Sequence, residues 1–172
     1  MSLVTKQAPG FELEGVANGD FTNVKLQDVR GKWVVMFFYP LDFTFVCPTE
    51  ILEFSRRKAE FEKLGAQILS VCVDSKYSHL AWQKDIGAVA YPMLSDITKE
   101  ISREYGVLLE DQGVALRGLF IIDPMGTVRY ELIHDLSVGR SVGETLRVLE
   151  ALQTGELCPV DWHPGDKTLG AG

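Results

Sequence analysis

The chain has 172 residues, of which 46% are hydrophobic and 24% charged, and its 24 acidic and 17 basic side chains give a formal net charge of -7. This size and composition predict one globular domain over residues 1–172 and exclude a disordered, collagenous or coiled-coil chain. Because no basic run is longer than Arg56-Arg57-Lys58, the acidic balance gives no electrostatic footprint for nucleic acid or an anionic membrane.

The first half of the chain predicts two buried strands, each followed by a helix. Lys32 to Tyr39 is almost wholly apolar and rich in β-branched and aromatic residues, as in a strand covered on both faces. Pro48 to Leu64 places its apolar residues on one broad helix face and is followed by Gly65, a residue that ends helices. A second strand, Gln67 to Val73, precedes a helix from Lys76 to Ile86. This alternation predicts an α/β fold.

The second half predicts one more crossover helix, a hairpin and a terminal helix. The crossover helix is expected over Asp96 to Tyr105, from apolar residues at fourfold spacing. Strands Gly118 to Asp123 and Thr127 to Ile133 flank a turn that contains Pro and Gly, so they form an antiparallel hairpin and make the sheet mixed. Ser141 opens a helix that ends near Gly155. Residues 156–172 lack periodicity and are expected to form an extended arm.

The chain contains three cysteines, at positions 47, 72 and 158. They form no C-x-x-C, lie beside no histidine, and predict neither a disulfide scaffold nor a metal site. No Gly-rich phosphate loop is present, so we expect no nucleotide cofactor. The longest apolar run, Trp33 to Tyr39, is too short to span a bilayer or serve as a leader. We therefore expect a cytoplasmic protein, in which thiols are either inert or reactive.

Cys47 stands at the predicted start of a helix that directly follows a central strand. Unpaired N–H groups and the helix dipole favour an anion there, so a thiolate forms more easily than in free cysteine. Thr44, three residues earlier, brings a hydroxyl group to the same loop. The alternative is an inert filler, since free cysteine is among the most buried residue types.

The segment from Tyr39 to Glu50 resembles the active-site signature of the peroxiredoxins, which runs Pro, three residues, Thr, two residues, Cys. Pro40, Thr44 and Cys47 match it at every spacing, and Pro48-Thr49-Glu50 follows as in the typical two-cysteine class. The likeness extends along nearly all the chain: Val73 to Ser75, Ser78 to Trp82, Tyr105 to Leu108, Arg117 to Asp123, Val138 to Ser141, and Leu157 to Pro159 with Trp162. Within that class the chain is similar to the bacterial alkyl hydroperoxide reductase and thioredoxin peroxidase type.

This resemblance implies a thioredoxin-like fold with a central mixed sheet, flanking helices and a C-terminal arm. It implies that Cys47 is the peroxidatic cysteine, which attacks a peroxide and becomes a sulfenic acid. Arg117 matches the arginine that supports the thiolate and the peroxide, and its fixed charge suits both tasks. Pro40 matches the residue that shields the site. Glu50 and Arg140 match a pair that orients Arg117.

The resemblance also implies a role for Cys158, within the predicted arm of residues 156–172. It would be the resolving cysteine, reaching Cys47 of the partner subunit to form an intersubunit disulfide in a homodimer. A sulfenic acid condenses with an accessible second thiol, which a tail residue offers. The alternative for Cys158 is a spare surface thiol. Cys72, inside a buried strand, is expected to be inert because an apolar setting raises the pKa of a thiol.

The predicted function is therefore that of a thiol-dependent peroxidase acting on hydrogen peroxide and small organic hydroperoxides without metal or prosthetic group. The implied electron donor is a dithiol protein, either thioredoxin or a dedicated flavoprotein disulfide reductase. Whether homodimers assemble into decamers stays open. The first alternative function is that of an oligomeric holdase chaperone or peroxide sensor, for which Phe43, Phe45 and Tyr77 would supply exposed apolar contacts. The second, a thioredoxin-like disulfide oxidoreductase, is disfavoured by the missing C-x-x-C.

Overall fold

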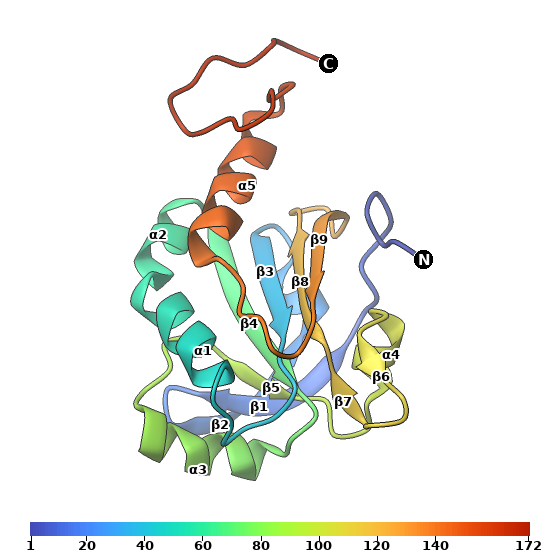
Figure 1. The fold of residues 1–172 in the computed structure, drawn as a ribbon, viewed down its shortest axis with the longest axis vertical. Helices are drawn as coiled ribbons and strands as arrows, with labels where there is room; N and C mark the ends of the chain where they lie inside the picture. Colours follow the sequence, from blue (N-terminus) through green and yellow to red (C-terminus); the bar gives the residue numbers. More distant parts are fainter. The chain divides into compact units, whose positions relative to one another are not determined.

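The computed structural model describes all 172 residues and divides them into two compact units, Met1–Arg140 and Ser141–Gly172 (Figure 1). The prediction of one domain over residues 1–172, with 156–172 as its arm, stays a prediction. The strands of the first unit are β1 (Glu12–Ala17), β2 (Asp20–Lys25), β3 (Trp33–Phe38), β4 (Ala66–Cys72), β5 (Met93–Ser95), β6 (Leu108–Leu109), β7 (Val114–Ala115), β8 (Arg117–Ile122) and β9 (Val128–His134). Its helices are the short 3₁₀ helix η1 (Leu26–Val29), α1 (Cys47–Arg56), α2 (Lys58–Lys63), α3 (Lys76–Ile86) and α4 (Glu100–Glu104).

Seven of these strands form one mixed sheet in the order β2-β1-β5-β4-β3-β8-β9. Strand β4 pairs in parallel with β3 and β5, whereas β8 pairs antiparallel with β3 and β9. The predicted hairpin and the mixed character of the sheet are both confirmed. Because β3 lies between β4 and β8, its two neighbours in the sheet come from widely separated parts of the sequence.

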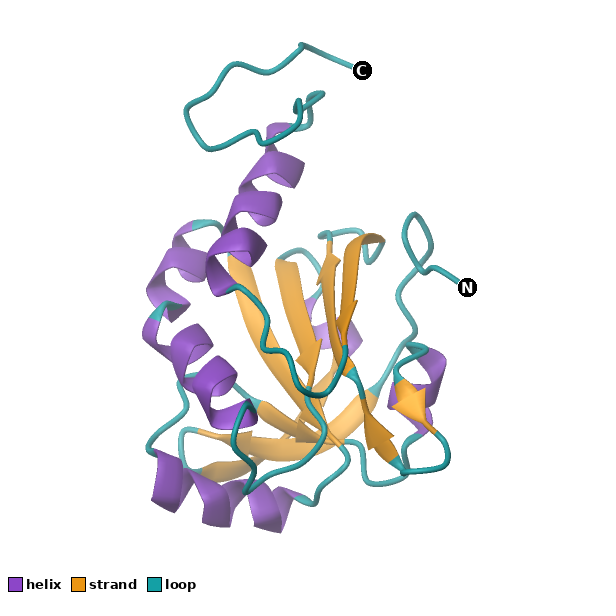
Figure 2. Ribbon diagram, viewed as in Figure 1, coloured by secondary structure: helices purple, strands orange, loops and turns teal.

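Strand β3 is buried on both faces, as its composition predicted. Val34, Met36 and Phe38 belong to a hydrophobic core that includes residues of η1 and α4. On the other face, the ring of Phe37 stacks on that of Phe54 in α1, with the centroids 4.5 Å apart. Figure 2 shows α1 and α2 on one side of the sheet at β3 and α4 on the other. Alternating side chains of one strand thus hold both layers of helices.

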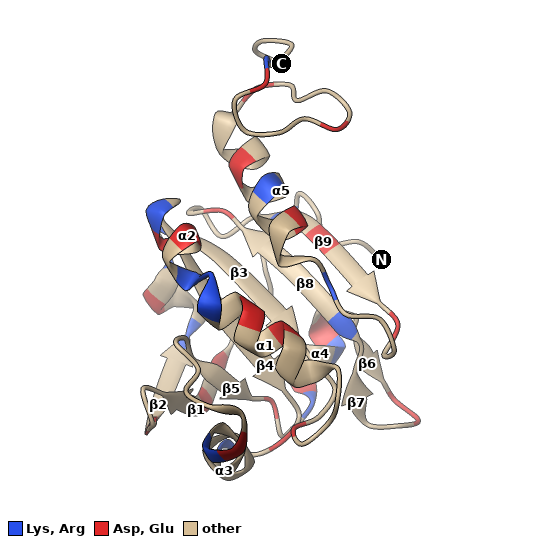
Figure 3. Ribbon diagram, turned by 60° about the vertical axis from the view of Figure 1, so that its left-hand side comes forward, with Lys and Arg blue, Asp and Glu red and all other residues tan.

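The predicted helix from Pro48 to Leu64 is in fact two helices, α1 and α2, which meet at Arg57. The backbone there leaves the helical range, with φ -98° and ψ 9°, and the N–H of Glu60 bonds to the carbonyl of Arg57 three residues earlier. Periodicity could not reveal this break because Phe54 and Phe61 are both buried on the same side. Both helices contain charged residues of both signs (Figure 3).

Helix α4 is shorter than the predicted span of Asp96 to Tyr105. The Asp96 carboxylate accepts hydrogen bonds from the backbone N–H groups of Ile101 and Ser102, at 3.2 and 2.7 Å, and Lys99 adopts a left-handed conformation with φ 64°. Asp96 is therefore a cap placed before the helix and not its first turn. Strands β1, β2, β5, β6 and β7 were not predicted.

The second unit begins with the predicted capped helix, α5 (Val142–Thr154). The Ser141 hydroxyl accepts from the N–H of Glu144 at 3.1 Å, and Gly155 ends the helix with φ 66°. Residues 156–172 contain no helix or strand, as expected, but they turn back on themselves, because Leu157 exchanges backbone hydrogen bonds with Leu169 and Gly170. None of the helices in the chain combines the length and apolar character needed to span a membrane.

Candidate active site

Cys47 is the first residue of α1, so the predicted position at a helix start is confirmed. Pro48 occupies the first turn, where its missing N–H costs no helical hydrogen bond. The side chain of Cys47 is fully buried. The loop that leads to it, residues 40–46, leaves the end of β3. A central strand and a helix N-terminus thus fix the thiol, and the loop between them forms its surroundings.

Arg117 brings a positive charge to this thiol from a distant part of the sequence. It is the first residue of β8, the neighbour of β3 in the sheet, and it is buried. Its Nη1 donates to Cys47 Sγ at 3.3 Å, and its Nε donates to the Leu136 carbonyl at 2.8 Å. A guanidinium at this distance stabilises a thiolate relative to a thiol.

The Glu50 carboxylate forms ion pairs with two arginines, Arg117 and Arg140, and so holds Arg117 in place. Its Oε1 accepts from Arg117 Nη1 at 2.8 Å, while its Oε2 accepts from Arg140 Nε at 2.6 Å and from the Arg140 backbone N–H at 2.8 Å. Burial by itself raises the pKa of Glu50, but the hydrogen bonds and charge of Arg140, followed by the charge of Arg117, lower it below its ordinary value. The carboxylate is therefore ionised between two arginines.

Arg140 is itself fixed by contacts on two further sides. Its Nη1 donates to the Gly118 carbonyl at 2.5 Å, and its guanidinium lies 5.0 Å from the ring centroid of Phe37. The three charged side chains of Glu50, Arg117 and Arg140 are all buried. Because one carboxylate faces two guanidinium groups, the cluster keeps an excess positive charge beside Cys47.

Pro40 and Thr44 line a pocket of about 470 Å³ together with Arg117. Its other walls are mostly apolar: Leu41, Phe45, Val46, Val114 and Leu136, with Gln112 at the edge. The Thr44 hydroxyl donates to the Leu41 carbonyl at 2.9 Å. Its proton is thus already engaged, which leaves the hydroxyl oxygen free to accept a hydrogen bond.

A larger cavity, of about 570 Å³, lies elsewhere in the first unit and is lined by Lys58, Gln67 and Tyr91, among others. It contains no cysteine or histidine. Tyr91 instead has a structural contact there, since its hydroxyl donates to the Ile51 carbonyl of α1 at 2.8 Å. Size alone therefore does not mark the site of the chemistry.

Cys72 is as buried as Cys47 but has different neighbours. Its Sγ lies 3.6 Å from the Pro40 carbonyl and 3.9 Å from Asp74 Oδ2. Burial, and after it the negative charge of Asp42, raises the pKa of this thiol well above its ordinary value. The potential ligand atoms of Asp42, Cys72 and Asp74 lie within 4.8 Å of one another, but a protonated thiol is a poor metal ligand. The predicted inert role agrees with this setting.

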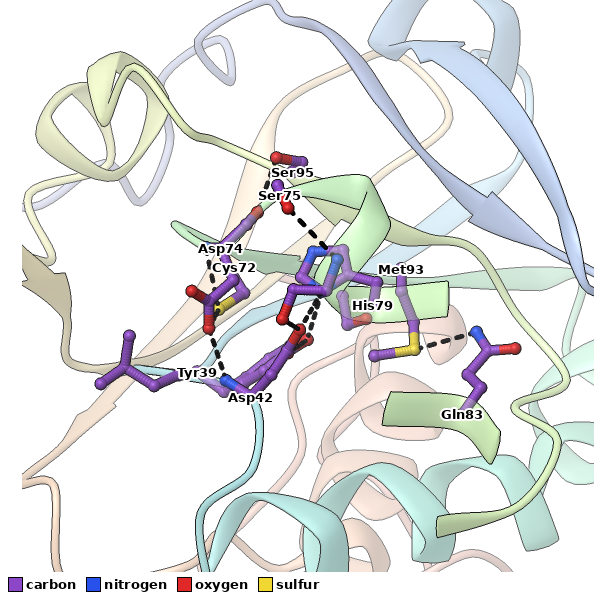
Figure 4. Close-up of polar contacts among 12 residues, drawn as sticks. Tyr39, Asp42, Cys72, Asp74, Ser75, His79, Gln83, Met93 and Ser95 are labelled. Carbon is purple, nitrogen blue, oxygen red and sulfur yellow. Dashed lines mark hydrogen bonds and ion pairs between the residues drawn. The ribbon is translucent and has the colours of Figure 1, made fainter. Parts of the chain in front are cut away.

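A second set of polar side chains in the site was missed by the sequence analysis. Asp42, in the middle of the active-site loop, is buried and accepts hydrogen bonds from Tyr39 and His79 (Figure 4). It also accepts one from the Ser78 hydroxyl. An aspartate inside the mostly apolar stretch Tyr39 to Val46 was the available signal, because a buried carboxylate needs partners. Spacing gave no indication that His79 would be one of them.

The structure thus brings together six of the seven predicted site residues in the first unit: Pro40, Thr44, Cys47, Glu50, Arg117 and Arg140. Cys158 belongs to the second unit, where it is half-buried in the irregular segment after α5. Its Sγ lies 3.5 Å from Thr154 Oγ1 and 3.7 Å from the Ala151 carbonyl. These are weak contacts for a thiol.

Comparison with known proteins gives one consistent result. Residues 4–131 match the model of the AhpC/TSA family. The chain is 57% identical over 97% of its length to a protein named as a peroxiredoxin in the rubredoxin operon of Clostridium pasteurianum, and covers 98% of that protein. It is 51% identical to a thioredoxin peroxidase of Echinococcus granulosus, with 98% of this chain and 92% of that protein covered. The crystal structure of reduced Plasmodium vivax 2-Cys peroxiredoxin is similar with a TM-score of 0.94 at 42% identity, covering 97% and 92% of the two chains.

Proposed function

The chain belongs to the AhpC/TSA family and is a typical two-cysteine peroxiredoxin of thioredoxin-like fold, and from this premise we propose how its own residues reduce peroxides. Thiol-dependent peroxidase activity follows from the family. We infer that Cys47 is the nucleophile. The observation that carries this assignment is the hydrogen bond of 3.3 Å from buried Arg117 to Cys47 Sγ.

In the first step, the Cys47 thiolate attacks one oxygen of a hydroperoxide. The sulfur–oxygen bond forms as the oxygen–oxygen bond breaks, the sulfur is oxidised to a sulfenic acid, and the peroxide is reduced. The departing hydroxide or alkoxide takes up a proton and leaves as water or an alcohol. Arg117 supports this step twice, because its charge stabilises the attacking thiolate and its N–H groups can donate to the peroxide oxygens.

Pro40 and Thr44 prepare the pocket for this reaction. The Thr44 oxygen is free to accept from the O–H of the incoming peroxide, since its own proton bonds to the Leu41 carbonyl. Pro40 lines the same pocket with a side chain that has no hydrogen-bonding group and limits the access of water. The mostly apolar rim is suited to small organic hydroperoxides as well as hydrogen peroxide.

In the second step, Cys158 of the partner subunit resolves the sulfenic acid. Its thiolate attacks Cys47 Sγ, a disulfide forms, and hydroxide leaves and is protonated to water. Because Cys47 is fully buried and a disulfide requires close Cα atoms, the first turn of α1 has to unwind before this bond forms. The weak contacts of Cys158 in its irregular segment suit such a rearrangement.

The partners follow from the same cycle. A dithiol protein returns two electrons to the disulfide, and thioredoxin or a dedicated flavoprotein disulfide reductase fits this chemistry. The intersubunit disulfide requires at least a homodimer, of which a decamer is a multiple. A cytoplasmic location fits a cycle that needs a reducing dithiol donor.

The test follows peroxide loss with a thioredoxin system for the wild type, Cys47→Ser and Cys158→Ser. We expect Cys47→Ser to lose turnover completely. Cys158→Ser should be oxidised once at Cys47 but should form no disulfide-linked dimer on a non-reducing gel. Full turnover by Cys47→Ser, or a normal dimer band from Cys158→Ser, would refute the respective role.

One observation favours a second candidate function, that of an oligomeric holdase chaperone or peroxide sensor. Phe45 is 93% exposed, and Phe43 and Tyr77 are exposed as well, so apolar surface is available to unfolded clients. Such a role needs no turnover. Cys47→Ser separates the two candidates, because a holdase would still suppress the aggregation of a heated client protein.

A further inference from the structure

Tyr91 attaches the link between α3 and β5, residues 87–92, to α1, the helix that begins with Cys47. Its hydroxyl donates to the Ile51 carbonyl of α1 at 2.8 Å. One helical turn further along, Ser55 Oγ accepts from the backbone N–H of Ala90 at 2.9 Å. Two neighbouring residues of the link therefore hold α1 at two points on the same helix face.

The Tyr91 side chain is itself firmly placed. It is only 3% exposed, and its ring meets that of Phe37 edge to face, with the centroids 5.9 Å apart. The next residue, Pro92, accepts a hydrogen bond from the Ser70 N–H of β4 at 3.1 Å, which fixes the link to the sheet. Burial, the main cause, raises the pKa of the Tyr91 hydroxyl well above its ordinary value. The hydroxyl therefore keeps its proton and donates it to α1.

Ile51 is the residue on which the first turn of α1 closes. In an α-helix each N–H bonds to the carbonyl four residues earlier, so the Ile51 N–H closes the turn that starts at Cys47. The Ile51 side chain is fully buried, and its carbonyl is the one that Tyr91 holds. The first turn, residues 47–50, thus folds against a residue fixed on two sides.

This support opposes the movement that the second step of the cycle requires. The first turn of α1 has to unwind before the proposed disulfide can form. Unwinding frees the Ile51 peptide to move, and the buried Tyr91 hydroxyl then loses a well-placed acceptor. Because a buried donor without a partner is costly, the contact stabilises the folded turn relative to the unwound one.

We propose that Tyr91 is a positioning residue for the resolution step: by holding Ile51 it sets the fraction of molecules in which the Cys47 turn is unwound. The proposal rests on the roles of Cys47 and Cys158 given above. The folded turn stays the major form, and Arg117 contacts Cys47 Sγ from β8 and not through the link. Peroxide reduction by Cys47 therefore does not depend on the Tyr91 hydroxyl.

The Cys47 sulfenic acid has two fates, and unwinding decides between them. In the unwound state it condenses with the Cys158 thiol, so that a disulfide forms and water leaves. In the folded turn its sulfenate attacks one oxygen of a second hydrogen peroxide; the oxygen–oxygen bond breaks, the sulfur is oxidised to the sulfinic acid, and water leaves. A weaker hold on Ile51 therefore speeds disulfide formation and lowers the yield of sulfinic acid.

The experiment compares Tyr91→Phe with the wild type, using the reduced full-length protein. The substitution removes one hydroxyl and keeps the buried ring. After one equivalent of hydrogen peroxide, rapid alkylation and a non-reducing gel measure disulfide formation, which should be about threefold to tenfold faster in the variant. The peroxide concentration that converts half of Cys47 to sulfinic acid, read by mass spectrometry, should rise in parallel. The rate constant of Cys47 oxidation, measured by stopped flow, should equal that of the wild type.

Hydrogen exchange measures the hold on α1 without any contribution from Cys158. In the reduced protein, amides of residues 47–56 should exchange about threefold to tenfold faster in Tyr91→Phe. Ser55→Ala removes the other contact and should shift exchange and disulfide formation in the same direction by a smaller factor, because Ala90 is exposed and its N–H can bond to water. If Tyr91→Phe does not fold, Ser55→Ala takes its place.

The matched control is Tyr105→Phe. Tyr105 is also buried, and its hydroxyl also donates to a backbone carbonyl, that of Pro9, at 2.8 Å. This variant therefore removes an equivalent hydrogen bond that does not involve α1. Its rate of disulfide formation and the exchange of residues 47–56 should equal those of the wild type.

Three results would overturn the proposal: unchanged exchange of α1 in Tyr91→Phe, disulfide formation no faster than in the wild type, or an equal acceleration in Tyr105→Phe. Cys158→Ser in the same assay separates the two proposals. A normal disulfide-linked dimer from Cys158→Ser refutes the proposed role of Cys158. Absence of that dimer beside an unaffected Tyr91→Phe refutes only the role of Tyr91.

Discussion

Cys47 and Cys72 are both fully buried thiols in the first unit of the protein, yet their surroundings are opposite in charge. Cys47 lies 3.3 Å from the guanidinium of Arg117. Cys72 lies 3.9 Å from the carboxylate of Asp74, and the charge of Asp42 adds to the effect of burial in raising its pKa. Burial by itself disfavours an ionised thiol.

The difference between the two thiols teaches that the neighbouring charge, and not exposure, distinguishes Cys47, the proposed nucleophile, from Cys72. A cationic neighbour offsets the desolvation of a thiolate, whereas an anionic neighbour adds to it. Changes to the charges around each cysteine therefore test the comparison directly, and the largest effects are expected around Cys47.

The largest expected effect comes from Arg117→Met, which replaces the guanidinium by an uncharged chain of similar length. The variant loses the charge beside Cys47 and the donors that we propose for the peroxide. We expect the second-order rate constant of Cys47 oxidation by hydrogen peroxide, measured by stopped flow, to fall about a hundredfold to a thousandfold.

Arg103→Met is the control for this prediction. Arg103 also pairs with a glutamate, Glu110, at 2.6 Å, but its side chain is 52% exposed and lies outside the site. Its rate constant should match that of the wild type. An Arg117→Met protein as fast as this control would show that the charge beside Cys47 is not needed.

A smaller effect on rate is expected from Glu50→Gln, which keeps the shape of the side chain but removes its charge. Arg117 and Arg140 would then face each other without a counter-ion, so we expect about a tenfold slower peroxide reaction and a free energy of unfolding lower by about 3 kcal/mol. Urea denaturation and stopped flow measure the two quantities. Glu53→Gln, which alters the exposed pair with Arg56, should change neither appreciably.

The same variant predicts a change in the pH dependence of stability. The pKa of Glu50 is lowered in the folded protein from an ordinary value of 4.5, so its ionised form stabilises the fold above pH 4.5. That contribution is lost as the pH falls through the lowered pKa. The urea midpoint of Glu50→Gln should therefore fall less steeply than that of the wild type below pH 4.5, and parallel curves would contradict the ion pair.

The smallest effect is expected from Cys72→Ala, on the other side of the comparison. Because the Cys72 thiol stays protonated, its removal should leave the peroxide rate constant within about twofold of the wild type and cost about 1 kcal/mol of stability. Iodoacetamide should label Cys47 and not Cys72 in the folded wild type, as mass spectrometry of the peptides would show. Labelling of Cys72 at a comparable rate would remove the distinction between the two thiols.

How well the sequence predicted each feature depended on how close together in the sequence the residues that determine it lie. Strand β3 and the helix start at Cys47 were predicted because an apolar run and a following proline act locally. The break at Arg57 was missed because Phe54 and Phe61 continue the apolar face across it. The late start of α4 was missed because the Asp96 cap resembles a first helical turn until its hydrogen bonds are seen.

The sequence by itself determined the motif spacing that places Pro40, Thr44 and Cys47 on one strand end, loop and helix start, since these residues are close along the chain. Only the tertiary structure decided what surrounds them. Arg117 is 70 residues from Cys47, and it arrives because β8 pairs with β3 in the sheet. His79 reaches the loop because α3 packs beside it. Contacts of this range depend on strand order and helix packing, which no local pattern specifies.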